Sequence, residues 1–161
     1  AEWEYASRSG GDDLYSGGRS LPENGWFRDN RTDPRRVRLA DGVDGALPVS
    51  QLNANAFGLF DMSGNVWEWC WDLYGPYPTL DQTNPTGPKE SNDLSAPSTS
   101  RAVMTQPGLN LNGNNHRVRR GGSFRNKAQH CRTTNRAHSE ANSVSSATGF
   151  RFCRSDQGRS Q

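Results

Sequence analysis

The stretch NAFGLFDMSGNVWEWCWD occupies residues 55–72 and holds three of the five tryptophans in this 161-residue chain. Trp67, Trp69 and Trp71 alternate with a glutamate, a cysteine and an aspartate. This two-residue period is typical of a β-strand, in which successive side chains point to opposite faces of a sheet. We therefore expect a strand here, and we expect all three tryptophans to lie in the core.

The composition around this strand is typical of one small, loop-rich domain over residues 1–161. Its 17 glycines and 9 prolines oppose long helices, whereas its six Phe, five Trp and four Tyr oppose a disordered chain. No run of sequence approaches the ~20 apolar residues of a membrane span, so we expect none. A formal net charge of +2 gives no basic footprint, so we expect no nucleic-acid partner. The sequence does not indicate a cellular compartment.

The other expected elements are short. A helical stub over residues 1–8 ends at a Gly-Gly pair, and polar sequence rich in proline, asparagine and serine predicts a long loop over 75–117 and another over 137–147. We expect further strands near residues 25–27 and over 117–124, 129–136 and 149–153. The three scattered histidines are expected on the solvated surface.

Three stretches in this order resemble one known family. They are AEWEYA at 1–6, the tryptophan-rich stretch at 55–72, and RVRRGGSF…CRTTNR…TGFRFCR within 117–154. Together they are similar to the sulfatase-modifying-factor family, the formylglycine-generating-enzyme branch of the C-type lectin fold. The resemblance implies an α+β, loop-rich fold. It also implies that this chain is the C-terminal portion of such a domain, since family members carry a first strand and two helices before AEWEYA.

The family's enzymes bind copper with two cysteines near RGGS and oxidise a substrate cysteine. Cys131 matches the second of these cysteines, whereas the first falls on Asn126. A copper(I) site requires soft thiolate ligands, and one cysteine beside an amide does not supply the pair. We therefore expect no enzyme activity and a buried, structural Cys131. A copper-dependent cysteine oxidase and a non-catalytic regulatory member of the family remain the alternatives.

The closing segment resembles, more narrowly, the variable proteins of diversity-generating retroelements. RGGS at 120–123, Cys131-Arg132 and GFR at 149–151 match the constant frame of those proteins, and the positions between them have diverged. The resemblance makes 117–154 a candidate variable region. It implies a module that binds an unknown protein or surface ligand and performs no chemistry.

We expect this partner to dock on one exposed face built from residues 125–147. The predicted anchors are Arg125, His130 and His138, because large polar side chains, arginine above all, are favoured at binding hot spots. The candidate ligand-binding residues are Arg125, Asn126, His130, Thr133, Asn135, Ala137, His138, Ser139, Ala141, Asn142, Ser143, Ser145, Ser146 and Ala147.

The family resemblance also implies a structural calcium ion at the turn before the tryptophan-rich strand. Its ligands are a side-chain oxygen, two backbone carbonyls and a glutamate, which match Asp61, Gly64, Val66 and Glu68. Calcium takes about 6–8 oxygen ligands, so carboxylates and carbonyls suit it. The alternative is that Glu68, which needs a partner if it is buried, pairs with an arginine or with backbone N–H groups.

Overall fold

The computed structural model describes residues 1–30, 32–35, 45–83, 85, 87–88 and 116–153. Most of the loop expected over 75–117 lies outside these residues, as does Arg154 at the end of the candidate variable region. The described elements are the helix α1 (Glu2–Arg8), the 3-10 turns η1 (Leu21–Glu23), η2 (Arg28–Asn30) and η3 (Ala128–Cys131), and the strands β1 (Trp67–Leu73), β2 (His116–Arg120), β3 (Ala137–Glu140) and β4 (Thr148–Gly149). Among them, no helix has the length and apolar character needed to cross a membrane.

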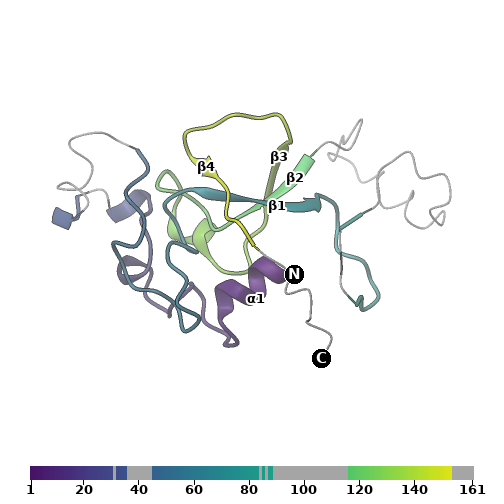
Figure 1. The fold of residues 1–161 in the computed structure, drawn as a ribbon, viewed down its shortest axis with the longest axis horizontal. Coiled ribbons are helices and arrows are strands. Elements are labelled where there is room, and N and C mark those ends of the chain that lie inside the picture. Colours follow the sequence, from purple (N-terminus) through teal and green to yellow (C-terminus); the bar gives the residue numbers. More distant parts are fainter. Residues whose placement is uncertain (31, 36–44, 84, 86, 89–115, 154–161) are drawn as a thin grey trace, which may run out of the picture.

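The four strands form one mixed sheet in the order β3-β2-β1-β4. β1 pairs antiparallel with β2 and parallel with β4, and β2 pairs antiparallel with β3. Figure 1 shows α1 on one side of this sheet and the loop from β3 to β4 arching over the other side. Few helices, one curled sheet and long connections confirm the expected α+β, loop-rich class.

Alternation along β1 gives the sheet two different faces. Glu68 points toward α1, where its Oε2 accepts a hydrogen bond of 2.7 Å from Trp3 Nε1. Arg120 lies opposite Glu68 in the register and forms an ion pair of 3.1 Å with Glu4 of the same helix. The face toward α1 is therefore held by buried polar contacts rather than by an apolar layer.

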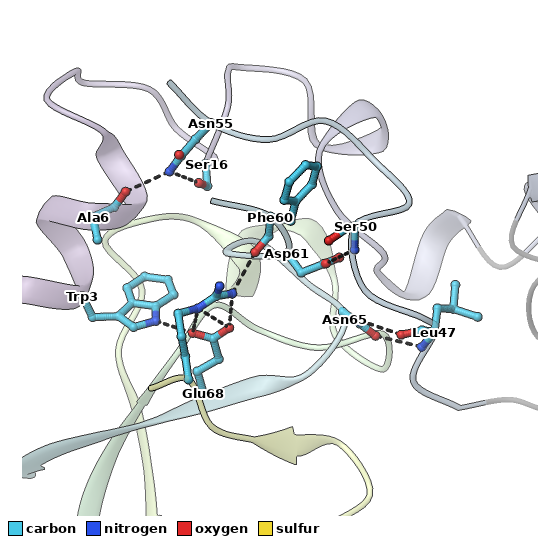
Figure 2. A network of polar contacts seen from close by, with 11 residues as sticks. Trp3, Ala6, Ser16, Leu47, Ser50, Asn55, Phe60, Asp61, Asn65 and Glu68 are labelled. Carbon is cyan, nitrogen blue, oxygen red and sulfur yellow. Dashed lines mark hydrogen bonds and ion pairs between the residues drawn. The ribbon is translucent and has the colours of Figure 1, made fainter. Parts of the chain in front are cut away.

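The apolar core lies beside the sheet, among the loops of residues 10–65. Trp26 is completely buried and clusters with Leu47 and Leu52. The side chain of Asn65 clamps one of these loops, because it accepts from the Leu47 N–H at 2.9 Å and donates to the Leu47 carbonyl at 3.0 Å (Figure 2). A Cβ on Gly64 would lie 2.4 Å from the Trp26 carbonyl oxygen, so this close packing requires glycine.

The tryptophans of β1 are not all in the core, and this part of the prediction is wrong. Trp67 is buried and Trp69 is half-buried, but Trp71 is 83% exposed. All three lie on the sheet face that turns away from α1. A two-residue period predicts a strand correctly but does not tell how well each face is covered.

The strand predictions on either side of β1 need several corrections. Residues 25–27 form no strand; they connect η1 to η2 with Trp26 buried between them. The strand expected over 117–124 is β2, which begins one residue earlier and ends at Arg120 because Gly121 and Gly122 have φ values of 91° and 74°. Such left-handed angles end a regular strand.

The C-terminal third differs further from the prediction. The strand expected over 129–136 is absent, and η3 stands at its beginning. The polar loop expected over 137–147 instead opens with β3, which pairs with β2. The strand expected over 149–153 is reduced to β4, where only Thr148 and Gly149 pair with β1.

Candidate binding surface

The RGGS segment at 120–123 forms a buried frame. Arg120, Gly121, Gly122 and Ser123 are all buried, and the Phe124 ring that follows is completely enclosed. The Phe124 N–H donates to the Asn65 carbonyl at 2.8 Å, which ties this segment to the turn before β1. The chain then emerges at the surface, so the frame fixes where the next side chains start.

The candidate ligand-binding residues fall into three groups by burial. The exposed ones are Arg125, Ala141, Asn142, Ser143, Ser145 and Ser146. The half-buried ones are Asn126, His130, Asn135, Ala137, His138 and Ser139. The buried ones are Thr133 and Ala147. We call the six exposed residues the variable surface.

Thr133 and Ala147 were predicted on the exposed binding face, but both side chains are buried. Thr133 is 1% exposed, and its hydroxyl donates to the Asp13 carbonyl at 3.1 Å while its N–H donates to the Leu14 carbonyl at 3.0 Å. Ala147 is 6% exposed, and its carbonyl accepts from the Trp67 N–H at 2.8 Å. Both residues therefore belong to the frame.

The two ends of the variable surface meet in space. Arg125 Nη2 donates to Ser146 Oγ at 3.2 Å, although 21 positions separate these residues in the chain. The Arg125 guanidinium also lies over the Phe124 ring, 5.2 Å from its centroid. An exposed arginine is thus held against the serine-rich loop that leads into β4.

The predicted anchor His138 lies apart from Arg125. The register places it opposite Val118, on the sheet face toward α1, whereas its neighbours Ala137 and Ser139 lie on the other face. Its ring stacks on Tyr74 with centroids 4.1 Å apart and lies 5.1 Å from the ring of His116. Burial lowers the pKa of His138, and the nearby His116 and arginines lower it further. Within β3, the predicted anchor His138 therefore does not share a face with the candidate residues Ala137 and Ser139.

The turn before β1 shows how the residues predicted to bind calcium lie. Asp61 has a φ of 57°, and its Oδ2 accepts from the Ser50 N–H at 2.8 Å (Figure 2). Its Oδ1 is buried without a hydrogen-bond partner, and burial raises the pKa of this carboxyl group. Gly64 is buried and Val66 half-buried beside it.

Glu68 is engaged by protein donors rather than open to an ion. Arg151 Nη2 donates to Glu68 Oε1 at 2.7 Å and Arg151 Nε to Oε2 at 3.1 Å, in addition to the bond from Trp3. This is the arginine pairing that the sequence left as the alternative. As the side chains lie, the set does not fit a calcium ion, because only Asp61 offers a carboxylate oxygen without a partner. The described residues also contain no cluster of three or more His, Cys, Asp or Glu able to hold a metal.

Calcium at this turn stays a prediction from the sequence, and a thermal measurement tests it. If the ion binds, EDTA should lower Tm by several degrees, because a ligand of the native state stabilises it by mass action. Arg151→Gln, which frees the Glu68 carboxylate, should strengthen calcium binding in a titration. An unchanged Tm with and without EDTA, together with no calcium uptake by the variant, would contradict the prediction.

A comparison with known families decides the relationship of the chain. The family described as sulfatase-modifying factor enzyme 1-like domain matches residues 1–156. The chain belongs to the sulfatase-modifying factor enzyme 1-like family. This confirms the resemblance seen in the sequence, and with it the C-type lectin-like fold.

The relatives of this domain include both proteins named as enzymes and a protein named as inactive. The formylglycine-generating enzyme of Thermomonospora curvata is 33% identical over 163 residues, which cover 97% of this chain and 48% of that enzyme. The inactive C-alpha-formylglycine-generating enzyme 2 of Mus musculus is 37% identical over 82 residues, covering 47% of this chain and 25% of that protein. The chain thus spans about half the length of the first relative, and the family includes a member described as inactive.

A solved structure gives a third comparison. Treponema denticola variable protein 1 superposes on this sulfatase-modifying factor enzyme 1-like domain with a TM-score of 0.66 and 27% sequence identity, covering 92% of this chain and 43% of that chain. The similarity therefore extends from fold to sequence. It agrees with the narrower resemblance of the closing segment to variable proteins.

The two positions that the resemblance assigns to copper ligands do not form a thiolate pair in this sulfatase-modifying factor enzyme 1-like domain. Cys131 is completely buried, and burial raises the pKa of its thiol to about 12. Asn126 Oδ1 accepts a hydrogen bond of 2.6 Å from Ser123 Oγ. The amide is therefore part of a turn, and the thiol stays protonated at neutral pH.

One feature of the surface was missed by the sequence analysis. Arg119 lies over the Trp67 and Trp69 rings, and Arg117 lies over Trp71. A signal was present, since β2 has arginines at 117 and 119 and β1 has tryptophans at 67, 69 and 71. Without the register between the two strands, these patterns could not be placed against each other.

Proposed function

We propose that this domain is a non-catalytic binding module whose variable surface recognises a protein or surface ligand and is diversified by a retroelement. The observation that supports this most directly is the division of residues 120–149 into buried frame and exposed surface. RGGS and Cys131 of the constant frame are buried, while Ser143, Ser145 and Ser146, which lie between the frame segments, are exposed. The similarity to Treponema denticola variable protein 1 adds to it.

This division suits a surface that must change without unfolding. Substitutions at exposed positions usually change the free energy of unfolding by less than about 0.5 kcal/mol. Binding residues also commonly lie on loops that a rigid scaffold positions. Here the scaffold is the sheet and the RGGS turn, and the loop from β3 to β4 carries most of the variable surface.

Replacing Arg125, Ser143, Ser145 and Ser146 together by asparagine should leave Tm within about 3 °C of the parent, because none of these side chains is buried. The matched control replaces the two buried positions, Thr133 and Ala147, by asparagine and should lower Tm much more. Thermal unfolding followed by circular dichroism measures both. If the four exposed substitutions unfold the domain, the proposal is wrong.

Binding can be tested without knowing the natural ligand. A phage-display library randomised at the same four positions should yield binders to an unrelated protein such as lysozyme. A library of equal size, randomised at four exposed positions outside residues 117–154, is the control and should yield few. Equal yields from the two libraries would argue against a specialised surface. The genetic part of the proposal predicts a nearby reverse transcriptase gene and a copy of codons 117–154 that differs only at adenines.

The copper-dependent oxidase is tested by its own reaction. The protein is incubated with copper(I) and a peptide carrying the Cys-x-Pro-x-Arg motif, and the aldehyde is sought by mass spectrometry. We expect none, because Asn126 stands where the enzymes of the family have a cysteine and Cys131 is buried as a thiol. An enzyme of the family that carries both cysteines is the positive control, and turnover by this chain would replace the binding proposal.

A further inference from the structure

The sheet face that turns away from α1 carries tryptophans of β1 beside arginines of β2. Arg119 Cζ lies 5.5 Å and 5.6 Å from the ring centroids of Trp67 and Trp69, and Arg117 Cζ lies 5.2 Å from that of Trp71. We call these five residues the Trp–Arg face. By the strand register, the other side chains on this side of the sheet are Leu73, Ala137, Ser139 and Thr148, and the register of β1 against β2 shifts between Trp69 and Leu73.

The positive charge of this face has no acidic partner. In the described part of the chain, neither Arg117 nor Arg119 makes an ion pair, and the register places no Asp or Glu beside them. Arg119 donates to Thr148 Oγ1 at 2.9 Å and to the His138 carbonyl at 3.2 Å, but its Nε is buried without an acceptor. Burial also lowers the pKa of Arg119.

The apolar part of this face is open to solvent. Trp71 is 83% exposed. Its backbone is held by a hydrogen bond of 2.5 Å that Arg117 Nη1 donates to the Trp71 carbonyl. An exposed tryptophan beside arginines matches the composition of binding hot spots, in which Trp and Arg are both enriched. A ring held by a strand also loses little conformational freedom on binding.

We infer that the Trp–Arg face is a second docking surface, separate from the variable surface, and that it binds an acidic polypeptide segment. Carboxylates pair with the guanidinium groups of Arg117 and Arg119, since Arg–carboxylate hydrogen bonds are among the stronger ones. An apolar side chain of the segment packs on the exposed ring of Trp71. None of these five residues belongs to the variable surface as defined above, although Arg117 and Arg119 fall within the candidate variable region 117–154.

A single-stranded nucleic acid fits this face less well. Base stacking needs free faces on successive aromatic rings, but Arg119 lies over both Trp67 and Trp69, and Arg117 lies over Trp71, the most exposed of the three. The formal net charge of the chain is +2, which is small for a protein that binds a phosphate backbone. Charge and ring geometry together favour the acidic peptide.

Isothermal titration calorimetry at low salt with a short poly(Glu) peptide tests the inference, and a poly(Gln) peptide of equal length is the control ligand. We expect poly(Glu) to bind and poly(Gln) not to bind. Arg117→Gln should weaken binding of poly(Glu) by ~tenfold, the size expected when a charge-assisted hydrogen bond is lost. Trp71→Ala should weaken binding of a peptide that alternates Glu with Leu by ~tenfold, because its leucines pack on this ring whereas poly(Glu) has no apolar side chain. Added salt should weaken it further.

The matched control variant is Arg132→Gln, which removes an exposed arginine whose Nε donates to the Gln129 carbonyl, away from this face. It should bind poly(Glu) as the parent does. An equal loss with Arg132→Gln, or binding of poly(Gln), would overturn the inference. Tighter binding of single-stranded oligonucleotides than of poly(Glu) would overturn it in favour of nucleic acid. The variable surface is untouched in all these variants, so the result is independent of the function proposed above.

Discussion

Replacing Gly122 by alanine should destabilise the domain by more than about 4 kcal/mol, a loss seen only when a substitution disrupts the core or forces a strained backbone. The added Cβ would lie 2.6 Å from Cys131 Sγ and 2.8 Å from the His130 carbonyl oxygen. Gly122 also has a φ of 74°, a left-handed angle that costs an L-residue about 1–2 kcal/mol. Urea unfolding followed by tryptophan fluorescence measures the change in the free energy of unfolding.

Gly58 provides a control that isolates the steric part of this effect. It has the same φ of 74°, but a Cβ at this position would meet nothing within 4 Å. Gly58→Ala should therefore cost only the backbone strain, about 1–2 kcal/mol. If the two variants lose equal stability, the contact between Gly122 and Cys131 does not hold the RGGS turn, and the description of that turn as a rigid frame is wrong.

Replacing Glu68 by glutamine should lower the free energy of unfolding by about 3 kcal/mol, the lower end of the range for removing one partner of a buried ion pair. Glu68 is 5% exposed and accepts hydrogen bonds from Trp3 and Arg151, so it joins α1, β1 and the segment after β4 (Figure 2). The lower end applies because about a third of the Arg151 side chain is exposed to solvent, which screens its charge.

A double-mutant cycle with Arg151→Gln tests whether the pairing itself causes the loss. The double variant should be more stable than the sum of the two single losses predicts, because residues in direct contact are coupled. Asp29→Asn is the control for an exposed pair, since Arg28 and Asp29 are both about half exposed. It should cost less than about 1 kcal/mol. Additive losses in the cycle would contradict a direct role for the Glu68–Arg151 pair.

The division between frame and surface explains how one chain can combine stability with variation. Asn65 bonds to Leu47, Thr133 bonds to the carbonyls of Asp13 and Leu14, and Gly122 packs on Cys131. These contacts connect segments far apart in the sequence, and none of them uses a side chain of the variable surface. Arg125 and Ser146 bond to each other at the surface. Their loss removes this surface bond and the contact of Arg125 with the Phe124 ring, but none of the buried contacts named above.

The sequence by itself determined the family, the class of fold and the elements with strong local signals. The helix at its N-terminus, the strand that begins at Trp67 and the buried state of Cys131 were all predicted correctly. The end of the helix is signalled by the Gly-Gly pair behind it, and the strand signal comes from strict alternation. Both depend on neighbouring residues alone, so no tertiary contact is needed to recognise them.

Only the tertiary structure decided which side of each element is covered. Alternation places Glu68 and Trp69 on opposite faces of the sheet. It does not show that α1 covers the face with Glu68, or that Trp71 on the other face is exposed to solvent. The burial of Thr133 and Ala147 depends on carbonyl and N–H groups of Asp13 and Trp67, which are distant in the chain. The pairing of Arg119 with two tryptophans depends on the register between β1 and β2. These are long-range contacts, and a local sequence pattern holds no information about which distant segment it will meet.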